Sequence, residues 1–463
     1  MSIIWDSSIL KEIANAKSNR EWKATGLEID SRKVKKGDLF CAIKGSNLDG
    51  HNFIKGAMKN GAVACLVSNN NSVLNEIAFA KVNSVIKTIE KMAIEARRRS
   101  KAKFIAITGS VGKTGTKEMF RTCFSKVTDV FVNQSSFNNH IGVPVSLSQI
   151  PKSALFCVLE VGMNKKGEIK KLSELIKPDL AIITAVEQSH LQGLKDLRNI
   201  ALAKSEILYS LPKYGCFIFN KDTNFSQMLN DKAIKLKINN IISYGKSDYA
   251  NIKLINFKLR NNVYLIKVNC YGKIIEWEMP AIGEHWIHNS LSIIAAGIYY
   301  DLDINNILAG LRSFKLPFGR GNTINLSITG NSFWIIDDSY NSNPASLSAS
   351  LKRLAEIKNK GKKIVVLGDM LELGEKSLLL HKSFKRQIET GQINVLFTTG
   401  QYMRELYKII DKDFKKYHDD NLDSLTIKLK ALIEKDDVVL IKGSNSMNLK
   451  KIIKNIMNEE TII

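Results

Sequence analysis

Residues 104–118 place an apolar, β-branched run directly before a glycine-rich turn, and a Lys-Thr pair opens a helical stretch after the turn. Gly109 and Gly112 allow backbone N–H groups to close around an anion, and the N-terminus of the following helix adds partial positive charge. Ile107 stands where the standard G-x-x-x-x-G-K-S/T loop has its first glycine, so the turn is a short variant of that loop. An ordinary strand–turn–helix with a chance Gly-Lys-Thr is the competing interpretation, but strand, turn and helix all fall where a phosphate loop requires them.

The loop also predicts which side chains hold the phosphates. Lys113 can reach the β- and γ-phosphates of a nucleotide, and the Thr114 hydroxyl can coordinate Mg²⁺. The phosphate-binding residues expected from the sequence are therefore Gly109, Ser110, Val111, Gly112, Lys113 and Thr114.

Length and composition limit the class of protein. At 463 residues the chain is too long for one hydrophobic core, and two to four domains are expected. Apolar residues make up 44% of the chain, and no run is long enough to span a bilayer and no leader segment opens the chain, which predicts a cytoplasmic protein without membrane insertion. The six cysteines form no C-x-x-C pair, which is typical of buried thiols in a reducing compartment; they are Cys41, Cys65, Cys123, Cys157, Cys216 and Cys270.

The formal charge of +23 raises the possibility of a nucleic-acid partner. The lysines, however, are spread evenly along the chain, and few aromatic residues lie among them. A solvated basic surface is the favoured interpretation, so no nucleic acid is expected. A basic field also helps to recruit a polyanionic small substrate.

The chain divides into three segments. Short strands and turns fill residues 1–82, followed by a basic amphipathic helix at 83–100. In 83–316 apolar strands alternate with helices, which indicates a mostly parallel sheet with an antiparallel insertion at 250–279. The βα alternation restarts in 317–463, which predicts a third α/β domain. The expected strands are 102–108, 154–160, 180–186, 216–220, 333–337, 363–367, 395–399 and 437–442.

Three residues of the middle segment could take part in chemistry at the carboxyl ends of its strands, where ligands bind in such sheets. Glu160 ends an apolar strand and suits a Mg²⁺ ligand, although a strand-end Glu is often only a surface residue. His190 follows the next strand, and a lone His is more often a satisfied polar residue than a ligand. Lys204 is a single lysine on a largely apolar helix, where burial would lower its pKa; a lysine that extends to solvent is the simpler alternative.

Taken together, these residues resemble the Mur ligases, the ATP-dependent family that forms the amide bonds of peptidoglycan precursors. The resemblance covers essentially the whole chain in collinear order. Its supporting segments are Asp30–Arg32, Gly37–Phe40, Asp49–His51, Gly109–Thr114, Asn133–Pro144, Glu160–Met163, His190, Ala203–Ile207, Gly283–His285 with Asn289, Leu316–Arg320, Asp337–Pro344, Val366–Gly374 and Lys442–Ser444.

The resemblance implies a fold and a reaction. The fold is α/β in three domains: a small UDP-binding domain, a central ATPase domain with a mostly parallel sheet, and a Rossmann-like C-terminal domain that closes over ATP and binds the incoming dipeptide. The segments are similar to those of members that add D-alanyl-D-alanine to UDP-N-acetylmuramoyl-tripeptide through an acyl phosphate. The implied partners are these small molecules only, and a monomer is expected.

Site roles follow from the same resemblance. Lys113 contacts the ATP phosphates, Thr114 and Glu160 bind one Mg²⁺, and His190 with a carbamylated Lys204 binds or supports a second. Asn289 contacts adenine, while Arg320 and Asp338 belong to the C-terminal domain that closes on the nucleotide. The implied substrate-binding residues are Ser31, Arg32, Lys44, Asp49, His51, Asn138, Asn139, His140, Tyr340, Asn341 and Asn343.

Four residues depart from the family pattern. Val111, Gly115 and Trp286 stand where Asn, Thr and Asn are common, and these changes leave the phosphate chemistry intact. Asn445 replaces an Arg that often follows Lys-Gly-Ser and bears on the dipeptide contacts.

Three alternatives stay open. A related Mur ligase adds a diamino acid at position three, but its C-terminal signature reads Asp-Tyr-Ala-His-Thr-Pro where this chain has Asp338-Ser-Tyr-Asn-Ser-Asn-Pro344. Folylpolyglutamate synthetase shares the core but lacks this N-terminal domain. A basic phosphate-loop ATPase stimulated by nucleic acid is the rival from another class.

Overall fold

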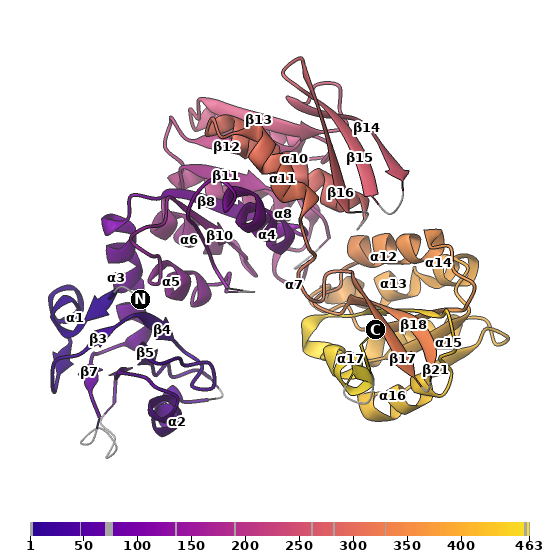
Figure 1. The fold of residues 1–463 in the computed structure, drawn as a ribbon, viewed down its shortest axis with the longest axis horizontal. Coiled ribbons are helices and arrows are strands. Elements are labelled where there is room, and N and C mark those ends of the chain that lie inside the picture. Colours follow the sequence, from indigo (N-terminus) through magenta and orange to yellow (C-terminus); the bar gives the residue numbers. More distant parts are fainter. Residues whose placement is uncertain are drawn as a thin grey trace.

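The computed structural model of the chain describes residues 3–46, 48–69, 77–134, 137–188, 191–260, 263–280, 283–328, 330–457 and 461–462. Within these residues three α/β bodies follow one another along the chain, each built on its own main sheet (Figure 1). In the figure the central body lies between the N-terminal body, drawn in indigo, and the C-terminal body, drawn in orange and yellow.

The N-terminal body is built on a five-stranded sheet in the order β2-β7-β6-β5-β4. Strands β4 to β7 pair in parallel, and β2 pairs antiparallel with β7. Trp5, in the separate β1–β3 pair, donates its indole N–H to the carbonyl of Ser148 in the central body at 2.8 Å. The elements are β1 (Trp5–Asp6), α1 (Ser7–Ala14), β2 (Lys17–Ser18), β3 (Lys23–Ala24), β4 (Gly26–Glu28), β5 (Asp38–Cys41), α2 (Ile54–Lys59), β6 (Ala64–Val67) and β7 (Phe79–Lys81).

A nine-stranded sheet in the order β16-β15-β14-β13-β12-β11-β8-β10-β9 forms the central body. Its strands from β9 to β14 are parallel, and β14, β15 and β16 form an antiparallel extension. The strands are β8 (Lys103–Thr108), β9 (Val130–Val132), β10 (Phe156–Glu160), β11 (Leu180–Ile183), β12 (Cys216–Asn220), β13 (Asn240–Gly245), β14 (Ile252–Arg260), β15 (Val263–Cys270) and β16 (Lys273–Pro280).

Helices cover both faces of this sheet, and strand β8 shows why its sequence is apolar throughout. Phe104 and Ala106 pack into the core on one face, whereas Ile105 and Ile107 pack into the core on the other. A strand buried on both faces has no polar alternation. The helices are α3 (Val85–Arg99), α4 (Lys113–Phe124), α5 (Gly142–Leu147), α6 (Glu168–Ile176), α7 (Leu191–Leu194), α8 (Leu197–Lys204), α9 (Ser226–Lys235), α10 (Glu284–Tyr299) and α11 (Ile304–Arg312).

The C-terminal body carries a seven-stranded sheet in the order β21-β20-β19-β22-β18-β17-β23, in which β18 to β22 are parallel. Its strands are β17 (Asn322–Ile328), β18 (Asn331–Asp338), β19 (Lys363–Gly368), β20 (Val395–Thr399), β21 (Lys416–His418), β22 (Val438–Lys442) and β23 (Thr461–Ile462). Its helices are α12 (Pro344–Glu356), α13 (Ser377–Lys382), α14 (Lys385–Thr390), α15 (Gln401–Ile409), α16 (Leu422–Lys430) and α17 (Lys450–Met457).

The predicted α/β class, the mostly parallel central sheet and the antiparallel insertion are confirmed. Each main sheet lies within one of the three segments predicted from the sequence. The prediction missed the three-residue strands β9 and β21, the strand β13, and the partly polar strand β17. All six thiols are buried and free, and none of the helices in the described ranges is long and apolar enough to cross a membrane.

Candidate active site

The phosphate loop lies between β8 and α4, as the sequence predicts. Gly109 has φ +156° and Gly112 has φ +86°, the left-handed values that favour glycine. A Cβ on Gly109 would overlap the Thr184 hydroxyl, and one on Gly112 would lie 2.8 Å from Oδ1 of Asn289. The loop is therefore closed between the end of β11 and helix α10. Helix α4 begins at Lys113 with no side-chain cap, so the backbone N–H groups of its first turn suit an anion.

Lys113 bends back over the loop. Its Nζ donates to the carbonyl of Gly109 at 2.8 Å. Desolvation lowers the pKa of Lys113, and the charge of Glu160 opposes this shift. The ammonium group is thus already held at the loop, where the terminal phosphates of a nucleotide would lie.

Thr114 and Glu160 form the second part of the site. Glu160, at the end of β10, is 2% exposed and lies level with Ile107 of β8. The Thr114 hydroxyl donates to its Oε2 at 2.8 Å, and Asn138 Nδ2 donates to its Oε1 at 2.7 Å. Both carboxylate oxygens are therefore oriented. One hydroxyl and one carboxylate suit Mg²⁺, which takes one or two carboxylates together with phosphate oxygens.

Lys204 lies at the end of α8 and is 1% exposed. Burial lowers its pKa well below the ordinary value, and the neighbouring charge of Lys113 lowers it further. The described residues provide no hydrogen bond or ion pair for its ammonium group. His190, predicted beside it as a metal ligand, lies outside the described residues. Among those that are described, no three His, Cys, Asp or Glu side chains form a metal-binding cluster.

The C-terminal body reaches this site through Arg320. Its Nη2 donates to the Thr114 hydroxyl at 3.1 Å, and its guanidinium lies 4.0 Å over the ring of Tyr340. Asp338, predicted to act beside it, accepts a hydrogen bond from Lys442 Nζ at 2.7 Å. The structure therefore brings Arg320 to the phosphate loop, across 206 residues of chain.

Two other predicted residues of the C-terminal body have local structural roles. The side chain of Asn343 forms a capping box with Ser346 at the start of α12. The backbone carbonyl of Asn341 accepts a hydrogen bond from Lys442.

The N-terminal candidates are arranged differently. Arg32 is 85% exposed and pairs with Asp30 at 2.8 Å. His51 is 5% exposed; its Nδ1 lies 2.6 Å from Asp49 Oδ1, and its Nε2 accepts from the backbone N–H of Ser68 at 3.0 Å. Both ring nitrogens are engaged, so His51 fixes the loop rather than presenting a free nitrogen. Of the candidates here, Ser31 and Asp49 are partly exposed, and Arg32 and Lys44 are exposed.

Comparison with known proteins assigns this arrangement to a family. Residues 23–106 match the Mur ligase family catalytic domain, 107–297 the Mur ligase middle domain and 319–445 the Mur ligase glutamate ligase domain. The UDP-N-acetylmuramoyl-tripeptide–D-alanyl-D-alanine ligase of Rickettsia prowazekii is 32% identical over 451 residues, covering 97% of this chain and 99% of that protein. The chain belongs to the Mur ligase family. As a Mur ligase it is an ATP-dependent enzyme that forms a peptide bond.

Other relatives agree with this assignment. The Bacillus subtilis enzyme of the same name is 31% identical over 462 residues and is covered, like this chain, to 97%. A crystal structure of MurF from Acinetobacter baumannii has a TM-score of 0.82 and 25% identity, covering 98% of this Mur ligase and 99% of that chain. MurF from Thermotoga maritima in complex with ADP has a TM-score of 0.76 at 24% identity, covering 94% and 97% of the two chains.

Several groups that shape the site of this Mur ligase were missed from the sequence. Asn133 is fully buried, and its side-chain Oδ1 accepts a hydrogen bond from the Glu160 backbone N–H at 3.0 Å. Its backbone carbonyl accepts one from Lys117 Nζ at 2.7 Å. Thr184 packs closely against the loop at Gly109. Two signals were available: Asn133 opens a segment that carries the family resemblance, and a lysine among the apolar residues of a helix needs an internal partner if it is buried.

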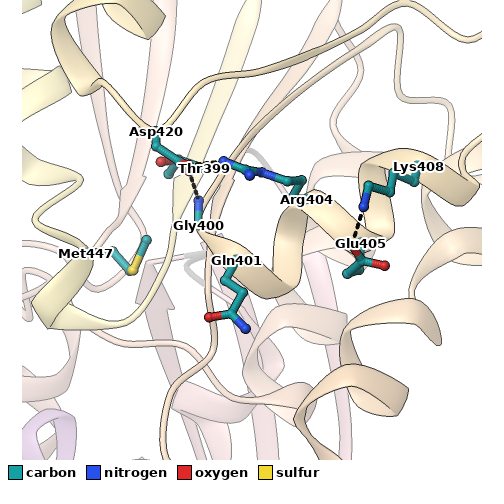
Figure 2. A pocket seen from close by; sticks show the side chains of 8 residues that line it. All are labelled: Thr399, Gly400, Gln401, Arg404, Glu405, Lys408, Asp420 and Met447. Carbon is teal, nitrogen blue, oxygen red and sulfur yellow. Dashed lines mark hydrogen bonds and ion pairs between the residues drawn. The ribbon is translucent and has the colours of Figure 1, made fainter.

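A separate cavity of about 620 Å³ opens on the C-terminal body, at the carboxyl ends of β20 and β21 (Figure 2). Arg404 pairs with Asp420, Lys408 with Glu405, and the Gly400 N–H donates to Asp420. None of the site residues predicted from the sequence lines it, and its charged groups already pair with one another. It is lined by Thr399, Gly400, Gln401, Arg404, Glu405, Lys408, Asp420 and Met447.

Proposed function

We propose that this Mur ligase adds D-alanyl-D-alanine to UDP-N-acetylmuramoyl-tripeptide, with hydrolysis of ATP to ADP and phosphate. The names of relatives that match nearly the whole chain support this substrate assignment. The observation that carries the proposal is the meeting of Lys113, Thr114 and Glu160 with Arg320 at one phosphate loop.

The residues present fit ATP and magnesium. Thr114 and Glu160 would hold one Mg²⁺, which neutralises charge on the transferring phosphoryl group when it is bound. Lys113 stabilises charge on the same group, while the tripeptide carboxylate attacks the γ-phosphorus and ADP leaves. The amine of the dipeptide then attacks the carbonyl of the acyl phosphate, loses a proton, and phosphate departs as the amide bond forms.

We propose that Lys204, as a carbamate, binds or supports a second Mg²⁺ together with His190. Burial lowers the pKa of Lys204 and favours the neutral amine. That amine forms an N–C bond to CO₂ and releases one proton, so a neutral nitrogen group becomes an anionic oxygen ligand. Incubation with ¹³C-bicarbonate should give a carbamate signal that Lys204→Ala lacks; active enzyme with an unmodified amine would contradict the assignment.

The three domains then divide the substrates. Residues 1–82 bind the uridine diphosphate part through Ser31, Arg32 and Lys44, in a stretch of chain that the pairing of Asp49 with His51 holds in place. Residues 83–316 bind ATP, with Asn289 on adenine and with Asn138, Asn139 and His140 facing the muramoyl-peptide. Residues 317–463 contribute Arg320 and Asp338 and bind the dipeptide through Tyr340, Asn341 and Asn343.

Acyl phosphates hydrolyse readily, so water must be excluded during the reaction. We propose that the C-terminal domain closes over the central one, with Arg320 near the hinge. Small-angle scattering should show a smaller radius of gyration with ATP and the muramoyl substrate together. Unchanged curves would count against closure. We further propose a cytoplasmic monomer that uses no nucleic acid.

The acceptor is tested most directly by a coupled assay. One mixture contains the purified chain, ATP, Mg²⁺, the muramoyl tripeptide and D-alanyl-D-alanine. A second mixture replaces the tripeptide with the shorter muramoyl substrate and the dipeptide with free diamino acids. We expect ADP only with the dipeptide. Turnover with a diamino acid would support the related ligase, and ADP formation stimulated by DNA or RNA would support the nucleic-acid ATPase.

A further inference from the structure

Gly115 and Trp286 fit together in a way that neither residue shows alone. Gly115 lies in the first turn of α4, and a Cβ there would lie 2.7 Å from Cη2 of the Trp286 indole and closer still to Cζ3. The indole therefore occupies the space of the missing side chain. Trp286 is 3% exposed. Gly inside a helix is less favourable than Ala, so the glycine that makes room for the ring lowers the stability of α4. The packing of the ring must offset that loss.

The contact is the second of two between α10 and the loop. Asn289 lies against the loop at Gly112, and Trp286 lies against α4 at Gly115, so the two contacts are three positions apart in each segment. Residues three apart on a helix lie on one face. Helix α10 therefore meets the loop and the first turn of α4 along a single edge, on either side of Lys113 and Thr114.

Other contacts hold this edge in place. The ring of Phe314 lies 5.5 Å from that of Trp286, and both are buried. Further along α4, a Cβ on Gly310 of α11 would lie 2.5 Å from the Cα of Cys123, so this part of the helix is also closely packed. The Trp286 Nε1 has no hydrogen-bond partner within the described structure, so the indole acts through packing and not through a polar contact.

We propose that Trp286 is a positioning residue for ATP: its indole, seated against Gly115, fixes the first turn of α4 relative to α10. Lys113 and Thr114 are thereby held at a set distance from Asn289, which joins recognition of the base to recognition of the phosphates. The inference rests on the proposed function, because it takes ATP as the ligand of this loop. A displacement of about 1 Å in a reacting or binding group can lower rates on the order of 100-fold.

A double-mutant cycle tests the pairing. Gly115→Ala adds the overlapping Cβ, whereas Trp286→Phe withdraws the ring atoms that it would meet. Each single change should raise the KM for ATP roughly tenfold and leave the KM for the muramoyl substrate within about twofold. The double variant should recover, with a KM for ATP well below the product of the two single effects. Effects that simply multiply would overturn the proposal.

Trp277→Phe is the matched control. Trp277 is also 3% exposed, belongs to the same apolar core, and likewise has an unpartnered Nε1. We expect both Phe variants to lower the Tm, but only Trp286→Phe to raise the KM for ATP and to lose the change in tryptophan fluorescence on adding ADP. Identical behaviour of the two variants would overturn the proposal. Failure of the unaltered enzyme to bind ADP would instead refute the proposed function.

Discussion

The phosphate loop and the Asp30–His51 stretch were both predicted as binding regions, yet the structure builds them in opposite ways. At the loop, Thr114 and Asn138 each donate a hydrogen bond to Glu160. Thr114 and Glu160 are buried, and Asn138 is partly buried. In the N-terminal stretch the buried His51 pairs with Asp49, which is 27% exposed, and Arg32 is 85% exposed. Phosphoryl transfer needs groups fixed before the substrate arrives, whereas gripping an extended substrate can use side chains that order on binding.

Their electrostatics differ as well. Desolvation lowers the pKa of Lys113 and of Lys204 in the central domain. In the N-terminal domain hydrogen bonds from His51 lower the pKa of Asp49, and hydrogen bonds from Arg32 lower that of Asp30. Burial in the central domain destabilises the charged form of the two lysines, and a bound polyanion would offset that cost. In the N-terminal domain the hydrogen bonds stabilise the charged carboxylates and therefore the fold.

The largest effect should come from Lys113→Ala. We expect kcat to fall by roughly 10³-fold, because a charge that stabilises the transferring phosphoryl group is lost. The Tm should hold, since the ammonium bonds only to Gly109 in the described structure. Phosphate release and thermal unfolding measure the two quantities. Lys126→Ala, on the exposed segment after α4, should retain activity; an active Lys113→Ala enzyme would refute the loop assignment.

Glu160→Gln should have the next largest effect. The amide keeps an acceptor for Thr114 but loses the negative charge, so we expect activity to fall on the order of 100-fold at a fixed Mg²⁺ concentration, with partial recovery at high Mg²⁺. A magnesium titration of the rate measures this. Glu206→Gln is the comparison: Glu206 is 5% exposed and accepts from the backbone of Gly167, so its loss should lower the Tm and leave the magnesium dependence unchanged.

How far the sequence predicts this contrast depends on how local each signal is. The loop and Glu160 were predictable, because a glycine-rich turn and a strand-end carboxylate are local patterns. The Lys117–Asn133 support was not, since its partners come from separate segments that meet only in the folded sheet. In the sequence Gly115 and Trp286 are only two separate departures from the family pattern, because the packing of α10 against α4 brings them together.

The N-terminal stretch shows the converse. The family resemblance at Asp49–His51 implied a binding region, but a resemblance does not report burial. Only the structure shows that the His51 ring lies between Asp49 and the Ser68 backbone. Likewise β13 was missed because the six residues NIISYG are too short for a clear period, and pairing with β12 and β14 determines the strand.

Substitutions of Arg32 and His51 should separate substrate binding from fold stability within the N-terminal stretch. Arg32→Ala should raise the KM for the muramoyl substrate roughly tenfold without changing the Tm, because exposed ion pairs add little stability. His51→Ala should instead lower the free energy of unfolding by about 1–2 kcal/mol, since it removes a buried ring and leaves the partly buried N–H of Ser68 without its acceptor. Substrate kinetics and urea unfolding distinguish them; equal effects on stability would erase the contrast.

The smallest expected effect is a dependence on pH. The pKa of Asp49 is lowered in the folded state, so its contribution to stability is present above the ordinary value of 3.8 and is lost as pH falls through the folded pKa. Asp49→Asn should therefore lower the free energy of unfolding by about 1 kcal/mol at pH 7, and the difference should shrink in acid. Urea unfolding at pH 7 and at pH 3 tests this. A difference that grows in acid would contradict the sign.

We propose that the Gly109–Thr114 loop holds ATP so that its terminal phosphoryl group passes to a peptide carboxylate. The direct measurement is ADP production by the purified chain, with the muramoyl tripeptide, the dipeptide and magnesium each omitted in turn. We predict ADP, phosphate and the pentapeptide product in equal amounts from the complete mixture only. No ADP from that mixture, or ADP made equally well without the peptide substrates, would show that the loop does not transfer phosphate to a peptide carboxylate.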